Sequence, residues 1–183
     1  MFETFRAKAQ AVSAEVHRVA GRAEAVDFVV ALLGREGVSQ APGAHALWAE
    51  GPVLAGEERG ALAARAPGLR FDVTRELAAS ARVGVSEMDW MVANTGTLAS
   101  AADGVAGRLV SMLPPLHVAL VPSARIVPDL PALFGKLSPA ETGYLALVTG
   151  PSRTADIERV LTIGVHGPAR LVIVVWDPPA GRA

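Results

Sequence analysis

Apolar positions near the N-terminus recur at helical spacing. The stripe consists of Phe2, Phe5, Ala9, Val12, Val16 and Val19, at steps of three or four residues, which is typical of one face of an α-helix. Gly21 interrupts it, and a second helix is expected to end near Gly34 or Gly37. The pattern predicts a helical segment over residues 1–36 that packs on the rest of the chain. The same stripe also suits an arm that pairs with a partner helix.

From residue 44 onward, short apolar runs alternate with helical stretches. Strands are predicted at 46–49, 69–73, 116–121, 144–148 and 171–176, and helices at 57–65, 75–81, 105–112, 130–137 and 154–161. This alternation is typical of a mostly parallel sheet with helices on both faces. Two further runs, 90–93 and 97–100, flank a tight turn and predict a local antiparallel hairpin. The sequence therefore predicts an α/β domain over residues 44–178.

Composition narrows the chemistry that is available. The 183 residues are 51% hydrophobic, which suits a packed domain. The chain contains no cysteine, so it can hold no iron–sulfur cluster with its own thiolates. No histidine or carboxylate cluster suggests a metal. A net charge of -1 gives no reason to expect a nucleic acid. With no membrane-length apolar run and no secretory signal, a cytoplasmic protein is expected.

One turn combines the features of an anion site. Gly150, Ser152, Arg153 and Thr154 lie between a predicted strand and a predicted helix. The start of a helix presents unpaired N–H groups and the positive end of its dipole, while Arg153 adds a forked cation. This set suits phosphate or carboxylate, particularly if the strand ends at the carboxyl edge of a parallel sheet. The alternative is a plain helix cap with Arg153 in solvent.

A histidine follows the same predicted helix. His166 precedes Gly167, and the glycines around it leave room for the imidazole. It is a candidate general acid or base, or else a polar residue of a turn. By contrast, His117 begins an apolar strand and is expected to be a core histidine.

Two other segments carry polar groups that suit a ligand. The turn between residues 93 and 98 consists of Asn94, Thr95, Gly96 and Thr97, whose hydroxyls and amide either line a pocket or only satisfy the turn. Arg108 stands near the start of a glycine-containing helix and is a candidate for binding an anion.

In this order, the segments resemble the LUD domain of lactate-utilisation protein C. The resemblance rests on residues 94–97, 107–122, 125–128, 150–158 and 164–168, and it covers about residues 85–176. It implies a three-layer αβα fold similar to that of the sugar-phosphate isomerase and CoA-transferase superfamily. It also implies a bacterial role in oxidising L-lactate to pyruvate, as a non-redox subunit that binds a small anionic ligand.

The resemblance implies partner proteins with iron–sulfur clusters and no cofactor bound by this chain, which agrees with the lack of cysteine. One position departs from the family, whose turn commonly begins with glutamate where this chain has Asn94. CoA-transferase-like enzymes use a glutamate nucleophile, and an amide cannot form that acyl intermediate. The likeness therefore does not extend to covalent CoA transfer through position 94.

Two alternatives to the lactate-utilisation subunit stay open. One is a stand-alone enzyme on a small phosphorylated or carboxylated substrate, an isomerase or a ligase-like activity, with His166 as acid or base and with Ser152 and Arg153 holding the anion. The other is a scaffold, a possible homo-oligomer, whose N-terminal stripe pairs with itself or a partner. The sequence leaves open whether the chain is an enzyme.

Overall fold

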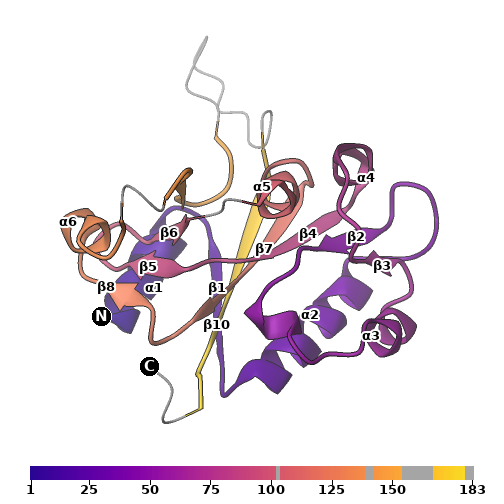
Figure 1. Cartoon of the computed structure of the whole chain (residues 1–183), viewed down its shortest axis with the longest axis horizontal. Helices are drawn as coiled ribbons and strands as arrows, with labels where there is room; N and C mark the ends of the chain where they lie inside the picture. The colour runs from indigo at the N-terminus through magenta and orange to yellow at the C-terminus, as the bar shows by residue number, and fades with distance from the viewer. Residues whose placement is uncertain (102–103, 139–141, 154–166, 180–183) are drawn as a thin grey trace.

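The computed structural model describes residues 1–101, 104–138, 142–153 and 167–179 (Figure 1). A six-stranded sheet forms its centre. The strand order is β1 (Glu15–Val19), β10 (Arg170–Trp176), β7 (Leu116–Pro122), β4 (Val83–Glu87), β2 (Ala46–Trp48) and β3 (Leu69–Arg70). Every neighbouring pair is parallel. β7 and β10 are almost continuously apolar because both faces of a parallel sheet are covered.

A second, four-stranded sheet lies against the first. Its order is β8 (Ile126–Val127), β5 (Trp90–Val92), β6 (Thr97–Ser100) and β9 (Ala146–Val148). β5 and β6 form the predicted antiparallel hairpin, and Gly96 takes a φ of 68° in its turn, a conformation that glycine adopts without strain. The strand expected at 144–148 exists as β9, but it pairs antiparallel with β6 and is not part of the parallel sheet.

Helices cover both faces of the large sheet, as expected for an αβα fold (Figure 1). On one face lie α2 (Arg22–Arg35), α3 (Arg59–Arg65) and the short 3-10 helix η1 (Pro52–Leu54). On the other lie α4 (Arg75–Ser80) and α5 (Val105–Met112), with α1 (Phe2–Ala11) and the small sheet beside them. α6 (Leu130–Phe134) covers the outer face of the small sheet. No helix in the described ranges is long and apolar enough to cross a membrane.

The prediction of a wholly helical N-terminal segment is wrong at residues 15–19. These residues form β1, an edge strand that pairs with β10 and is exposed at Glu15, His17 and Arg18. An edge strand has one neighbour, so it tolerates a sequence without strict alternation of apolar and polar residues. Arg170 of β10 donates hydrogen bonds to the Glu15 carboxylate at 2.9 and 3.1 Å. The pairing partner therefore decides the structure here, not the local spacing.

β4 has no counterpart among the predicted strands. Gly84 is its second residue, and an isolated glycine weakens a strand pattern. In the structure, Gly84 is the point where α5 approaches the sheet, because a side chain there would overlap the carbonyl group of Val110. The helix predicted at 154–161 lies outside the described residues.

Candidate functional site

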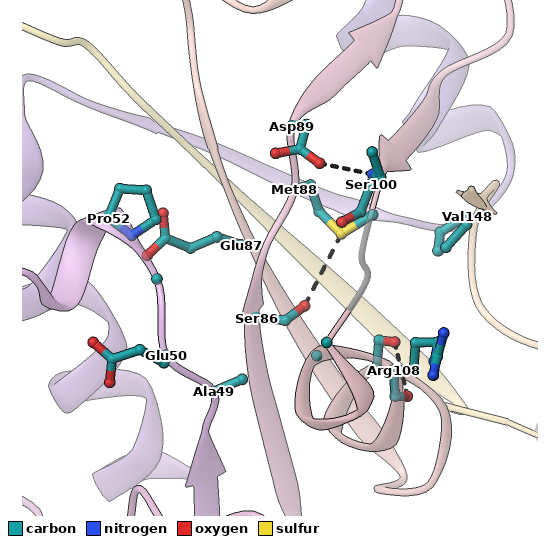
Figure 2. Close-up of a pocket in the computed structure, with 16 residues that line it drawn as sticks. Ala49, Glu50, Pro52, Ser86, Glu87, Met88, Asp89, Ser100, Arg108 and Val148 are labelled. Atoms are coloured by element: carbon teal, nitrogen blue, oxygen red, sulfur yellow. Dashed lines mark hydrogen bonds between the residues drawn. The ribbon is translucent and has the colours of Figure 1, made fainter. Parts of the chain in front are cut away.

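A cavity lined by several polar side chains, called the main cavity below, lies where the chain leaves neighbouring strands toward opposite faces of the sheet. After β2 the chain runs into η1 and α3 on one face, and after β4 it runs into the small sheet and α5 on the other. Such a divergence opens a crevice at the carboxyl edge of a parallel sheet, where ligands of α/β folds bind. The crevice here encloses about 230 Å³ and is drawn in Figure 2.

Polar side chains from four segments line this cavity. They are Glu50 after β2, Ser86, Glu87 and Asp89 at and after the end of β4, Ser100 at the end of β6, and Arg108 and Ser111 on α5. Among the described residues, three carboxyl groups thus share the cavity wall with one guanidinium group. In Figure 2, Glu87 extends from β4 toward Pro52, and Arg108 of α5 lies on the other side of the β4 ribbon, so the cavity spans the edge of the sheet. A small polar molecule fits this lining better than a large apolar one.

Glu87 is the most perturbed of the three carboxyl groups. Its Oε1 accepts a hydrogen bond from the N–H of Val53 at 2.6 Å, and a side chain at Gly51 would overlap its carboxylate. Burial is the main reason that the pKa of Glu87 is raised to about 7. The Val53 hydrogen bond and Arg22 lower this pKa, and the charges of Asp89 and Glu50 contribute smaller increases. Near neutral pH this carboxyl therefore exists in both protonation states.

The other two carboxylates are held by hydrogen bonds. Both oxygens of Glu50 accept from Nη2 of Arg59 at 2.6 Å. Asp89 accepts from the N–H of Ala101 at 2.8 Å. Glu50 thus has a charged donor beside it, whereas Asp89 and Glu87 each accept from one backbone N–H.

Arg108 is held over an aromatic ring. Its guanidinium carbon lies 4.6 Å from the centre of the Tyr144 ring, a favourable cation–π distance. Within the described part of the chain, its side chain forms no hydrogen bond or ion pair with a carboxylate. Among the described residues, its forked donors therefore have no bonded partner that an anion would need to displace.

Ser86 lines the cavity and also forms a buried hydrogen bond with His117. Its Oγ lies 2.8 Å from Nε2 of His117, and both residues are buried. Burial lowers the pKa of His117 to about 4, so the ring is neutral. The buried Nδ1 has no partner among the described residues. A buried nitrogen acceptor without a hydrogen-bond donor costs less free energy than a buried N–H without an acceptor. We therefore assign the proton of the neutral ring to Nε2. Ser86 then accepts from His117, and its own O–H donates to Sδ of Met88 at 4.0 Å, a weak acceptor that a polar ligand atom would replace.

The predicted site residues lie in three places: the turn of residues 94–97, the turn that begins at Gly150, and α5. Of those that the structure describes, Arg108 on α5 is the one that lines the main cavity. The expectation of a core histidine at His117 is confirmed. Glu87 and Ser86 were missed because β4 was missed. The alternating Val83 and Val85 before this polar pair are the signal that indicates a strand ending in a site.

The turn of residues 94–97 packs on α1, away from the cavity. Thr97 Oγ1 lies 2.8 Å from both Thr95 Oγ1 and Thr149 Oγ1, so the hydroxyls bond to one another. The N–H of Asn94 donates to the carbonyl of Pro128 at 3.0 Å. Gly96 sits against the backbone of Ala9, where any side chain would overlap it. These contacts fit the alternative in which the polar groups satisfy a turn.

The turn that begins at Gly150 contacts the connection between α1 and β1. Nη2 of Arg153 donates to Ser13 Oγ at 2.8 Å. The N–H of Ser152 donates to the carbonyl of Pro168 at 2.8 Å, and its side chain lies beside Gly167. The premise that this turn ends a strand of the parallel sheet is wrong, because β9 belongs to the small sheet. Thr154 and His166 lie outside the described residues.

Comparisons with known proteins give the family. The LUD domain family model matches residues 2–176. Lactate utilization protein C of Macrococcus caseolyticus is 36% identical over 108 residues, which cover 56% of this chain and 47% of that protein. Lactate utilization protein C 1 of Bacillus mycoides is 37% identical over 111 residues, which cover 56% and 46%. The chain thus spans about half the length of the curated relatives it matches.

The fold is also found in a solved structure. The crystal structure of a DUF162 family protein from Deinococcus radiodurans superposes with a TM-score of 0.65 at 18% sequence identity, over 96% of this chain and 95% of that one. This likeness extends across both sheets, and the family match reaches from α1 to β10. The chain belongs to the LUD domain family.

Proposed function

We propose that this chain takes part in lactate utilisation and that its main cavity binds a small carboxylate-bearing molecule. The process is supported by the names of the relatives, which share 36–37% identity with about half of this chain. The family match over residues 2–176 includes every residue of the cavity wall.

The ligand class is carried by one observation, the presence of Arg108 among the residues that line a small cavity. A carboxylate at Arg108 gains charge-assisted hydrogen bonds. The hydroxyl of Ser86 then offers a neutral hydrogen bond to a second polar group, such as the hydroxyl or oxo group of a short acid. The cavity volume of about 230 Å³ favours a ligand of this size over a nucleotide.

Calorimetric titration with L-lactate and with pyruvate tests the ligand. Replacing Arg108→Gln removes the charge, and we expect at least about tenfold weaker binding, as for the loss of one charge-assisted hydrogen bond. Arg125→Gln is the matched control, because Arg125 stacks on Trp90 at 4.9 Å and does not line the cavity. Equal binding by both variants, or no binding of either acid to the unaltered protein, contradicts the proposal.

Growth on L-lactate as sole carbon source tests the process. Deletion of this gene is expected to abolish growth, and a plasmid copy to restore it. Normal growth of the deletion strain, with no parallel gene present, contradicts the role.

We also propose that electron transfer takes place in partner proteins with iron–sulfur clusters, supported by the cysteine-free sequence. Tagged protein from lactate-grown cells should then retain iron-containing partners.

A stand-alone enzyme on a small carboxylated substrate is the second candidate. The observation that favours it is Glu87, a carboxyl group that lines the cavity and titrates near neutral pH, as general acids and bases do. The purified chain would then convert its substrate without partners. Failure to turn over a panel of hydroxy acids, oxo acids and sugar phosphates contradicts it.

A further inference from the structure

Glu87 occupies an unusual position at the cavity wall. One carboxylate oxygen accepts from the N–H of Val53 at 2.6 Å. For the other oxygen, the described residues provide no hydrogen bond. The backbone of Gly51 fills the space beside the carboxylate. The side chain is therefore fixed in place with one oxygen able to bond to a ligand.

The charges around Glu87 come from every neighbouring segment and are mostly compensated before a ligand arrives. Glu50, after β2, is paired with Arg59, and Asp89, after β4, accepts from the N–H of Ala101. Arg22 of α2 is paired with Glu57 at 3.4 Å. Arg108 of α5 also lines the cavity. An incoming carboxylate adds a negative charge to this setting. An ionised Glu87 repels that charge, whereas a protonated Glu87 can donate a hydrogen bond to it.

We propose that Glu87 takes up a proton from solution when a carboxylate ligand enters the cavity and then donates it as a hydrogen bond to the ligand. This inference rests on the proposed anion binding. Protonation costs little near neutral pH, because burial already raises the pKa of this group to about 7. The ligand charge raises that pKa further, so binding is linked to proton uptake and weakens as pH rises.

The linkage sets the expected size of the effect. For the uptake of one proton, affinity falls by up to about tenfold per pH unit above the pKa of the free protein. Below that pKa the carboxyl is already protonated and affinity is flat. Between about pH 6 and 8.5 we therefore expect a flat region followed by a steady decline.

Calorimetric titration of L-lactate and pyruvate in HEPES and in Tris buffer measures the protons taken up, because the two buffers differ in ionisation enthalpy. We expect uptake of between about half and three quarters of a proton at about pH 7.5, because about a quarter of the free protein is already protonated there. Glu87→Gln keeps the Val53 hydrogen bond and should lose both the uptake and the pH dependence. Glu76→Gln, an exposed position on α4 outside the cavity, is the matched control and should keep both.

The outcomes separate this inference from the proposed function. Binding without proton uptake, or equal uptake by Glu87→Gln, overturns the role of Glu87 and leaves anion binding intact. Absence of binding by either acid overturns both. A measurement without ligand adds an independent check, because the ¹³C resonance of the Glu87 carboxyl should titrate near pH 7 and be missing in Glu87→Gln. A midpoint near the usual glutamate value overturns the inference alone.

Discussion

At the scale of single residues, Glu87 and His117 have opposite effects on how stability depends on pH. The folded pKa of Glu87 is raised to about 7, so between about pH 4.5 and 7 the native state binds more protons than the unfolded chain, and stability falls as pH rises. The folded pKa of His117 is lowered to about 4, so between about pH 4 and 6.5 the unfolded chain binds more protons, and stability rises with pH. The two contributions offset each other over most of this range.

This opposition predicts a nearly flat stability profile for the unaltered protein from about pH 4.5 to 6.5. Glu87→Gln removes the falling contribution, so the free energy of unfolding should then rise by about 1.4 kcal/mol per pH unit over the same window. Urea unfolding at half-unit pH intervals measures it. Glu76→Gln should keep the flat profile. Equal rising slopes in the unaltered protein and in Glu87→Gln would show that Glu87 titrates at an ordinary pKa.

At the scale of elements, those with clear local signals were predicted, including the apolar strands β7 and β10, whereas β1 and β4 carry weaker signals and were missed. α4 and α6 are capped by Thr74 and Asp129, whose side chains accept from backbone N–H groups at 3.2 and 2.9 Å. The bounds of α5 are those predicted. β1 was mistaken for helix because its strand structure depends on β10. The same limit applies to the site, since Arg108 on a predicted helix was found and Glu87 on a missed strand was not.

The contact between β4 and α5 is the element-scale feature that is easiest to test. Gly84→Ala places a methyl group against the Val110 carbonyl and the Pro114 ring. We expect a loss of about 2–3 kcal/mol in the free energy of unfolding, as for other overpacked sites, and weaker ligand binding because α5 carries Arg108.

Gly34→Ala is the control for that substitution. Gly34 lies in α2, and a methyl group at this position would have no neighbouring atom within 4 Å among the described residues. Alanine should therefore stabilise the helix by about 0.5–1 kcal/mol. Thermal and urea unfolding of both variants gives the comparison. Equal effects of the two substitutions would refute the close approach of α5 to the sheet.

At the scale of the whole molecule, α1 joins the two sheets. Phe5 and Ala9 are fully buried in a core shared by β7, β10 and the small sheet. The turns at Gly96 and Gly150 also rest on α1 and on Val12 just after it. These stripe residues are therefore covered by the chain itself.

Phe5→Ala is expected to lower the free energy of unfolding by about 3–5 kcal/mol, because a fully buried ring leaves a cavity. Phe134→Ala is the matched control, since Phe134 is 54% exposed, and should change stability by less than about 0.5 kcal/mol. Denaturant unfolding measures both. Similar losses for the two variants would contradict the central position of α1.

The pairing of β1 with β10 has a consequence for the order in which the protein folds. Glu15 and Arg170, which bond across this pair, stand 155 residues apart in the chain. On the ribosome, β1 emerges early and has no neighbour until residues 170–176 have been synthesised. β10 also inserts between β1 and β7, so the large sheet stays divided until then. Contacts of such long range slow folding, and the nascent chain is exposed to aggregation for nearly the whole time of its synthesis.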